Sequence, residues 1–215
     1  MIDFSLIWSS LPALLKGASL SLLITLIASS IGFCLGALFG FAETAKSRLM
    51  RACVGTYVTL FRGTPMLVQI LFVYYVLPQF GILIPPFWAA GLAIGLNSAA
   101  YISQVIKSGI AAVPRSQIEA SQSLGFTPLK TFWHITLPQA MRISLPALGN
   151  ELVTLVKDSS LASIIGVLEL SKEASIIRSR TYDAFSILLA VALIYLILTA
   201  TLSLLLKKLE IRRFG

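Results

Sequence analysis

The chain has 215 residues, of which 57% are apolar and only 12% are charged, and its mean hydropathy is +0.88. This composition excludes an ordinary soluble protein and predicts a multi-pass membrane protein in contact with a lipid bilayer. The formal net charge of +8 would suit a nucleic-acid-binding protein, but the basic residues gather in short connections and in the C-terminal tail. That distribution is typical of membrane topology, so we expect no nucleic-acid partner.

The chain begins with an aromatic segment that leads into an uncharged one. Residues 1–16 carry Phe4 and Trp8, which suits an interfacial segment at the bilayer surface. No charged residue occurs from Ala18 to Ala42, and about 20 apolar residues suffice for a span. We therefore predict a first span over about residues 17–41. Because no basic region opens the chain, we expect this span to serve as an uncleaved insertion signal.

Glycines at four-residue spacing mark one face of this first span. Gly32, Gly36 and Gly40 would form a ridge of small residues that lets another helix approach closely. The crossing could lie between two subunits or within one subunit. We favour packing within one subunit.

Four further spans are expected, and they define an all-α fold with five transmembrane helices in a single domain over residues 1–215. The span over residues 143–168 is the weakest of them, because it carries Glu151, Lys157 and Asp158, and four spans plus a loop is the alternative. The further spans cover about residues 54–77, 87–106, 143–168 and 184–206.

The charges of the connections predict the orientation. Residues 107–142 carry four basic residues and one acidic residue, whereas residues 169–183 balance to zero. Because basic connections stay on the cytoplasmic side, we expect the N-terminus outside and the C-terminus in the cytoplasm. The basic residues of the three expected cytoplasmic segments are Lys46, Arg48, Arg51, Lys107, Arg115, Lys130, Arg142, Lys207, Lys208, Arg212 and Arg213, beside the acidic Glu43, Glu119 and Glu210.

The second span contains Arg62-Gly63-Thr64-Pro65 well inside it. Proline removes a backbone donor and glycine loosens a helix, so this sequence predicts a broken helix that faces protein or a watery cavity. Arg62 would stand beside the broken backbone, where its guanidinium or a freed amide could meet a carboxylate.

Two acidic residues in the fourth span form the other half of a candidate site. Glu151 and Asp158 are seven residues apart, so two helical turns place them on nearly the same face, roughly 10 Å apart. Such a pair suits a small cationic group, for example an ammonium group. Alternatively, the acids pair with Lys157 or Arg62 to satisfy a packed interior. The candidate substrate residues are Arg62, Thr64, Pro65, Glu151 and Asp158.

The longest polar connection, residues 107–142, predicts a pair of short helices that dock a partner. The first runs from about Gln117 to Leu124 and ends at Gly125, which tolerates the left-handed conformation. The second opens at Thr127 as N-cap with Pro128 at the first helical position, and closes at Leu137-Pro138.

Other chemistry is not indicated. Cys34 and Cys53 stand in different parts of the chain, so we expect no disulfide. His134 is the single histidine, so it cannot form a histidine-rich metal site, and we expect it to be a surface or packing residue. We find no catalytic triad, metal-ligand spacing or phosphate-binding glycine loop, and we expect neither a metal, a cofactor nor an enzymatic activity. If ATP drives this protein, a separate subunit must hydrolyse it.

The polar connection closely resembles the EAA loop of permease subunits of bacterial ABC importers. Glu119-Ala120-Ser121 is followed after three residues by Gly125, and after nine more by Ile135-Thr136-Leu137-Pro138. Ser121 replaces the alanine that is usual in this pattern. The segments 59–69, 96–101 and 145–151 are similar to the polar amino acid uptake branch of these permeases, whose five spans cover nearly the whole chain.

This resemblance implies a type I importer in the bacterial inner membrane. It implies two cytoplasmic ATP-binding cassette subunits, a second permease copy or a homologous permease, and an extracytoplasmic solute-binding protein. It implies a polar amino acid substrate, such as glutamine, arginine or histidine, held by residues that match the acids and the Arg-Gly-Thr-Pro segment. It assigns coupling to the ATPase to Glu119, Ala120, Ser121, Gly125, Ile135, Leu137 and Pro138.

Two alternatives stay open at this point. One is a secondary transporter or a channel, although five spans do not divide evenly into inverted repeats and the long docking loop would then have no role. The other is an importer permease for an opine or a cystine-like compound. The acid pair favours a cationic or neutral amino acid over an acidic one.

Overall fold

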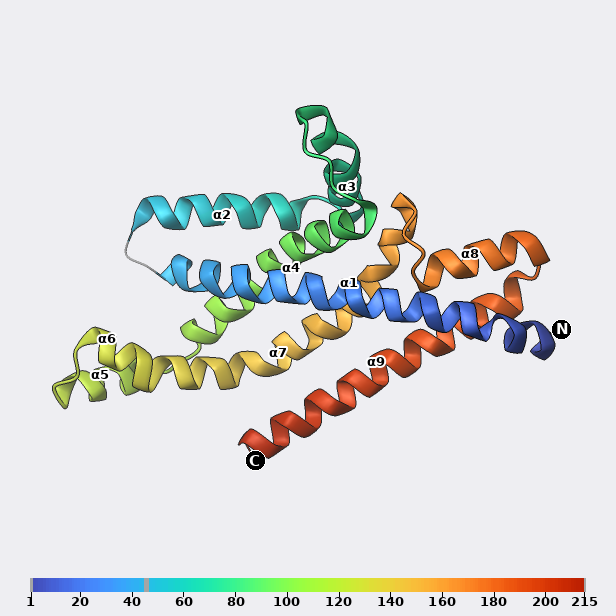
Figure 1. Cartoon of the computed structure of the whole chain (residues 1–215). Helices are drawn as coiled ribbons and strands as arrows, with labels where there is room; N and C mark the ends of the chain where they lie inside the picture. Colours follow the sequence, from blue (N-terminus) through green and yellow to red (C-terminus); the bar gives the residue numbers. More distant parts are fainter. Residues whose placement is uncertain (1, 45–46, 215) are drawn as a thin grey trace.

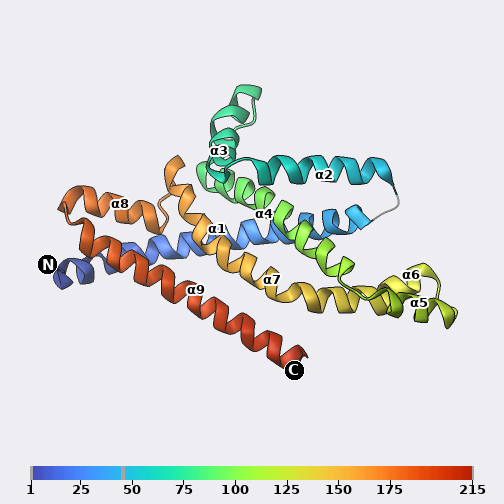
Figure 2. The same ribbon diagram turned by 180° about the vertical axis from the view of Figure 1, so that it is seen from behind.

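The computed structural model describes residues 2–44 and 47–214, with side chains through Lys208. Lys46 lies outside this part of the chain, and so do the side chains of Glu210, Arg212 and Arg213. The described residues form helices and no strand, which confirms the predicted all-α class (Figures 1 and 2). The α-helices are α1 (Phe4–Thr44), α2 (Arg48–Gly63), α3 (Met66–Leu71), α4 (Pro86–Ala111), α5 (Arg115–Ser123), α6 (Pro128–Thr131), α7 (Leu137–Asp158), α8 (Leu170–Thr181) and α9 (Ala184–Phe214).

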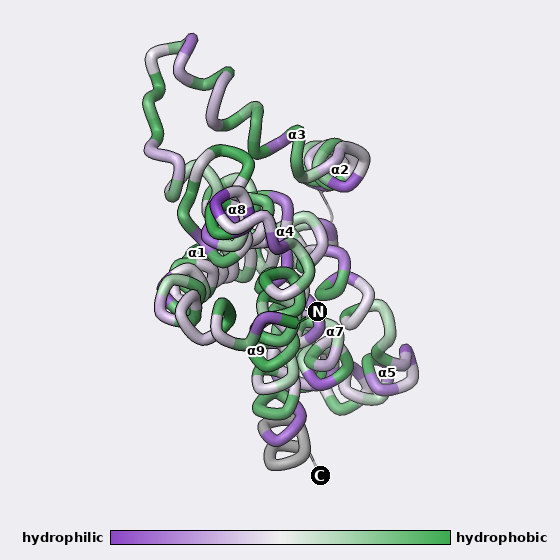
Figure 3. Tube along the Cα trace, turned by 90° about the vertical axis from the view of Figure 1, so that its right-hand side faces the viewer, coloured by the Kyte–Doolittle hydropathy of each residue, from purple (hydrophilic) through white to green (hydrophobic). Residues whose placement is uncertain are grey.

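Three helices of the described chain are long and apolar enough to cross a membrane. They are α1, α4 and the part of α9 that runs to Lys208, and α2 with the segment after it makes a fourth if that bent pair counts as one span. The count of five spans and the orientation stay predictions. Figure 3 shows long hydrophobic stretches along α9 and around α3, and hydrophilic residues around α5.

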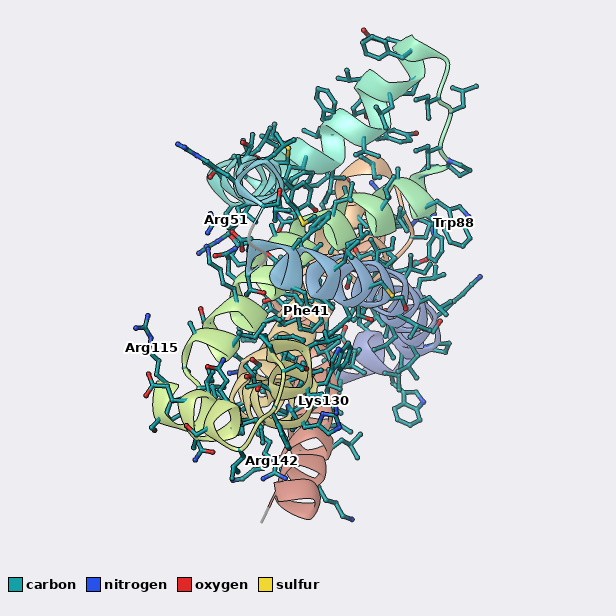
Figure 4. All side chains as sticks on the ribbon, turned by 90° about the vertical axis from the view of Figure 1, so that its left-hand side faces the viewer. Phe41, Arg51, Trp88, Arg115, Lys130 and Arg142 are labelled. Atoms are coloured by element: carbon teal, nitrogen blue, oxygen red, sulfur yellow. The ribbon has the colours of Figure 1, made fainter. Side chains whose placement is uncertain are left out.

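The basic connections gather at one end of the molecule. Figure 4 views the end that carries α5 and α6, where the end of α1 and the start of α2 also lie. The N-terminus and α8 lie at the opposite end (Figure 1). The positions of these segments agree with a shared side for residues 47–51 and 107–142. The basic residues labelled in Figure 4 are Arg51, Arg115, Lys130 and Arg142.

The glycine ridge of α1 packs against α4 of the same chain. A Cβ atom built on Gly36 would lie 2.6 Å from Cγ2 of Ile102, and one on Gly40 would lie 2.9 Å from Cβ of Ile106. Side chains at these positions would therefore push the two helices apart. The close crossing lies within the subunit, as we favoured.

Helix α1 is longer than a single span requires. Its 41 residues extend for about 62 Å, roughly twice the thickness of the hydrocarbon core of a bilayer. The expected boundary between the interfacial residues 1–16 and the first span is not a break in the helix. Gly17 there touches another element instead, because a Cβ at Gly17 would lie 2.9 Å from Cα of Leu170.

The expected exterior connection over residues 169–183 contains helix α8, and Glu169 is the N-cap of this helix. The Glu169 side chain is fully buried. Its carboxylate accepts hydrogen bonds from the Ser21 hydroxyl (3.1 Å), the Tyr195 hydroxyl (3.1 Å) and the backbone N–H of Lys172 (2.8 Å). Glu169 thus caps α8 and joins it to α1 and α9.

The end of the first short helix of the polar connection and the start of the second form as predicted. Gly125 follows α5 in the left-handed conformation (φ 85°), and the N–H of Phe126 donates to the carbonyl of Ser121 in a Schellman motif. Thr127 is the N-cap of α6 and accepts a hydrogen bond from the backbone of Lys130. Pro128 occupies the first position of α6.

The predicted end of the second helix at Leu137-Pro138 is wrong. A π-helical turn over Phe132–Thr136 leads from α6 into α7, and the N–H of Leu137 donates to the carbonyl of Phe132, five residues earlier. Proline interrupts a helix because it lacks an N–H and its ring crowds the preceding turn. Pro138 lies at the start of α7, directly after the wider π turn, which makes room for its ring.

We expect Gly36→Ala to destabilise the protein. Its new methyl group must displace Ile102 and approach the carbonyl of Ala99 at 3.0 Å, and overpacking of this kind costs about 1–3 kcal/mol. Gly55→Ala is the matched control, because no described residue beyond the adjacent turns of its own helix lies within 4 Å of a Cβ there, and alanine favours the helix. Thermal unfolding in detergent should show a lower Tm for the Gly36 variant alone. Equal shifts for both variants would contradict the close crossing.

Candidate functional site

The candidate site lies beside a break between α2 and α3. Helix α2 ends at Gly63, and the chain resumes at Met66 in a direction bent by 104°. Pro65 has no N–H, so the carbonyl of Phe61, four residues earlier, loses its helical donor. The predicted broken helix at Arg62-Gly63-Thr64-Pro65 is confirmed.

Two buried amide side chains replace the missing donor. Nε2 of Gln69 and Nδ2 of Asn97 both donate to the carbonyl of Phe61, at 2.8 and 3.1 Å. Asn97 also donates to Oε1 of Gln69 (3.0 Å), and Gln69 donates to the carbonyl of Thr64 (3.1 Å). This Gln69–Asn97 pair fastens the break to α4, where Asn97 lies. The bend is thus held by tertiary contacts as well as permitted by proline.

A cavity of about 510 Å³ opens beside the break, between α2, α4 and α7. We call it the first cavity. All five candidate substrate residues line it, so the structure brings together groups that are 96 residues apart at the extremes, from Arg62 to Asp158. Its lining consists of Arg62, Gly63, Thr64, Pro65, Met66, Asn97, Tyr101, Glu151, Thr154 and Asp158.

The first cavity contains charges of both signs that do not neutralise one another. Within the described residues, Arg62 makes neither an ion pair nor a hydrogen bond through its guanidinium, which instead lies 5.2 Å from the centroid of the Tyr101 ring. Glu151 accepts one hydrogen bond from Ser98 (3.2 Å). The described residues therefore contain no ion pair of Glu151 or Asp158 with Arg62 or Lys157, which was the alternative.

The two acids occupy one face of α7, as their spacing predicted. Glu151, Thr154 and Asp158 all line the first cavity, and they are separated by three and four residues. Residues at this spacing point in nearly the same direction from a helix. Two carboxylates thus face the space into which Arg62 projects from α2.

Sequence reasoning missed the contribution of α4 to this site. Neither Asn97 nor Tyr101 was a candidate, although both line the first cavity, and Gln69 and Ser98 hold its walls. A signal was present at Asn97, because an amide in a span without charges needs a hydrogen-bond partner.

The residues assigned to coupling lie apart from the cavity, at the end formed by α5 and α6. Ser121 is buried, and its hydroxyl lies 2.9 Å from that of Thr131, so the departure from the usual alanine adds a hydrogen bond between the two helices. Large apolar side chains are exposed nearby at Leu124, Leu129 and Trp133. Of the remaining coupling candidates, Glu119, Ala120, Gly125 and Pro138 are exposed, and Ile135 and Leu137 are half-buried.

Comparison with known proteins assigns the family. Residues 32–214 match the model of the binding-protein-dependent transport system inner membrane component. The chain belongs to this family. The resemblance to ABC importer permeases is thereby confirmed, and the assignment favours an importer subunit over a secondary transporter.

Several known proteins are similar to this chain over nearly its whole length. The glutamine transport system permease protein GlnP of Escherichia coli (strain K12) is 36% identical over 212 residues, which cover 98% of this chain and 97% of that protein. The arginine transport system permease protein ArtQ of Bacillus subtilis (strain 168) is 36% identical over 210 residues, with 97% and 96% covered. The crystal structure of an amino acid ABC transporter with histidines matches with a TM-score of 0.93 and 37% identity, covering 99% of both chains.

The Gln69–Asn97 pair yields a direct prediction. Asn97→Ala leaves the buried side-chain oxygen of Gln69 without a donor, which costs about 1–3 kcal/mol. We expect a lower Tm and faster hydrogen exchange of residues 64–71. Asn150→Ala is the control, because Asn150 is exposed, and its Tm should change little. Equal effects of the two substitutions would show that the pair does not hold the break.

Proposed function

We propose that this chain is the membrane subunit of an ATP-driven importer that carries a polar amino acid across the bacterial inner membrane. The observation that carries the proposal is the first cavity, in which Arg62 faces the acids Glu151 and Asp158 without an ion pair among the described residues. A zwitterion supplies the charges that complement both sides. Uncompensated charges at membrane depth are costly, which is why they usually mark a transport pathway.

The chemistry of the cavity suits an amino acid in a defined orientation. The planar guanidinium of Arg62 can bind an α-carboxylate through two hydrogen bonds. Glu151 and Asp158 can bind the α-ammonium group and, in arginine, the cationic side chain. A volume of about 510 Å³ lies within the usual range of small-molecule sites. Glutamine, arginine and histidine are therefore the favoured substrates, and the names of the relatives agree with this class.

The end of the molecule that carries α5 and α6 offers a surface for the ATPase. Leu124, directly after α5, is 81% exposed, and Leu129 on α6 is 68% exposed. Exposed apolar patches of this kind mark protein contacts. We assign this surface to a pair of cytoplasmic cassette subunits, which supply the nucleotide-binding site that this sequence lacks. A second permease copy or a homologous permease and an extracytoplasmic solute-binding protein complete the importer.

The transport cycle follows from two states with different affinities. Closure of the cassette subunits on ATP draws the α5–α6 segments together and opens the permease pair outward, so that the solute-binding protein delivers its amino acid. Hydrolysis separates the cassettes and opens the path inward. The difference in affinity between the two states gives the direction. Gly125, in its left-handed conformation, joins the two short helices that transmit the movement.

We expect Asp158→Asn to discriminate between substrates. In proteoliposomes with the cassette subunits and the binding protein, arginine-stimulated ATPase should fall about tenfold, because an amide cannot neutralise a second positive charge. Glutamine-stimulated ATPase should fall less. Glu173→Gln on α8, outside the cavity, should leave both unchanged.

Two results would contradict the proposal at different points. Equal losses for arginine and glutamine would remove Asp158 from recognition of the side chain. Gradient-driven uptake by this chain without a cassette ATPase would overturn the importer itself. Competition by opines or cystine-like compounds in the same assay tests the alternative cargo.

A further inference from the structure

A second cavity, of about 580 Å³, adjoins the first and has no assigned role. It lies between α4 and α7, and the two cavities share Arg62, Tyr101 and Glu151. Among the described residues, Arg62 and Glu151 are the charged residues that line the second cavity, whereas the first also contains Asp158. The second cavity is thus wide enough for the same molecule but offers it fewer charged partners.

The positions of the lining residues place the two cavities end to end. On α4, Asn97 belongs to the first cavity, Tyr101 to both, and Ala112 just beyond the helix end to the second. On the antiparallel α7, Asp158 belongs to the first, Glu151 to both, and Ile143 to the second. From Asp158 to Ile143 the path follows α7 for about 22 Å. It ends beside the predicted coupling segment.

Two of the three residues at the junction, Arg62 and Tyr101, are joined by one weak contact. The guanidinium of Arg62 lies over the ring of Tyr101, and this cation–π pair has no supporting ion pair in the described chain. Glu151, on α7, lines both cavities at this level. A carboxylate that binds Arg62 through two hydrogen bonds competes effectively with an aromatic face. The bound molecule itself can therefore draw Arg62 off Tyr101.

Two polar side chains in the wall of the second cavity, Gln104 and Ser144, are held in place by hydrogen bonds. The side chain of Gln104 donates to Glu43 at the end of α1 (2.5 Å), and the same Glu43 forms an ion pair with Lys107 (3.1 Å). The hydroxyl of Ser144 donates to the carbonyl of Val105 (3.3 Å). The second cavity therefore contains polar groups in defined positions and lies next to the predicted coupling segment.

We propose that the second cavity is an inward subsite for the transported amino acid, and that the stacked Arg62–Tyr101 pair is the barrier between the two cavities. This inference rests on the proposed function. The first cavity holds the zwitterion by charges of both signs. The second receives it after Arg62 leaves Tyr101, and holds it more weakly because Asp158 is out of reach. Release toward the coupling segment follows.

The barrier is tested by cysteine labelling of the complete transporter in inverted vesicles, whose cassette side faces the reagent. Cys34 and Cys53 are both free, so they are first replaced by alanine. A membrane-impermeant thiol reagent should modify Ser108→Cys, in the second cavity, faster than Thr154→Cys, in the first. Adding Tyr101→Leu should accelerate labelling of Thr154→Cys about fivefold, in line with loss of a cation–π pair. Tyr101→Phe keeps the aromatic face and should not.

The outcomes separate the barrier, the subsite and the proposed function. Equal labelling rates at the two cysteines, or no effect of Tyr101→Leu, would overturn the barrier. Excess glutamine should slow labelling of Ser108→Cys, and unchanged labelling in a transporter that takes up glutamine would overturn the subsite. Failure of the parent transporter to take up any amino acid would contradict the proposed function instead. The labelling ratio needs no transport and would still decide the barrier.

Discussion

The orphaned carbonyl of Phe61 is the constraint on which the site depends. Pro65 removes its helical donor, and a carbonyl without a partner is costly inside a membrane. Gln69 and Asn97 supply donors only where the chain has turned back toward α4. The 104° bend and its two donors therefore require each other, and together they leave Arg62 at the end of α2, facing the acids of α7.

Helix α4 connects this local arrangement to the rest of the fold. In lipid, helices associate through close packing and hydrogen bonds, because the surroundings are as apolar as the side chains. The glycine ridge of α1 lets α4 approach until Gly36 meets Ile102, and another face of α4 presents Asn97 and Tyr101 to the cavities. One helix thus combines tight packing with a polar lining, and the proposed passage runs along it from the charged site to the coupling segment.

Local rules predicted much of the site, and tertiary contacts account for what they missed. The break followed from Pro65, and the shared face of Glu151 and Asp158 followed from helical periodicity. The partners of Asn97 and Glu169 did not, because Gln69 is 28 residues from Asn97 and Ser21 is 148 residues from Glu169. The end predicted at Leu137-Pro138 failed because a π turn accommodates the proline. The presence of long apolar helices was predictable from hydropathy, whereas the angle of the bend was not.

The central claim is that opposed, unpaired charges in the first cavity bind a zwitterionic amino acid. A cryo-EM structure of the assembled transporter with a bound amino acid tests it most directly. Our account predicts density in the first cavity, with the carboxylate against Arg62 and the ammonium group against Glu151 or Asp158. An amino acid bound outside this cavity, or with its carboxylate toward the two acids, would contradict it.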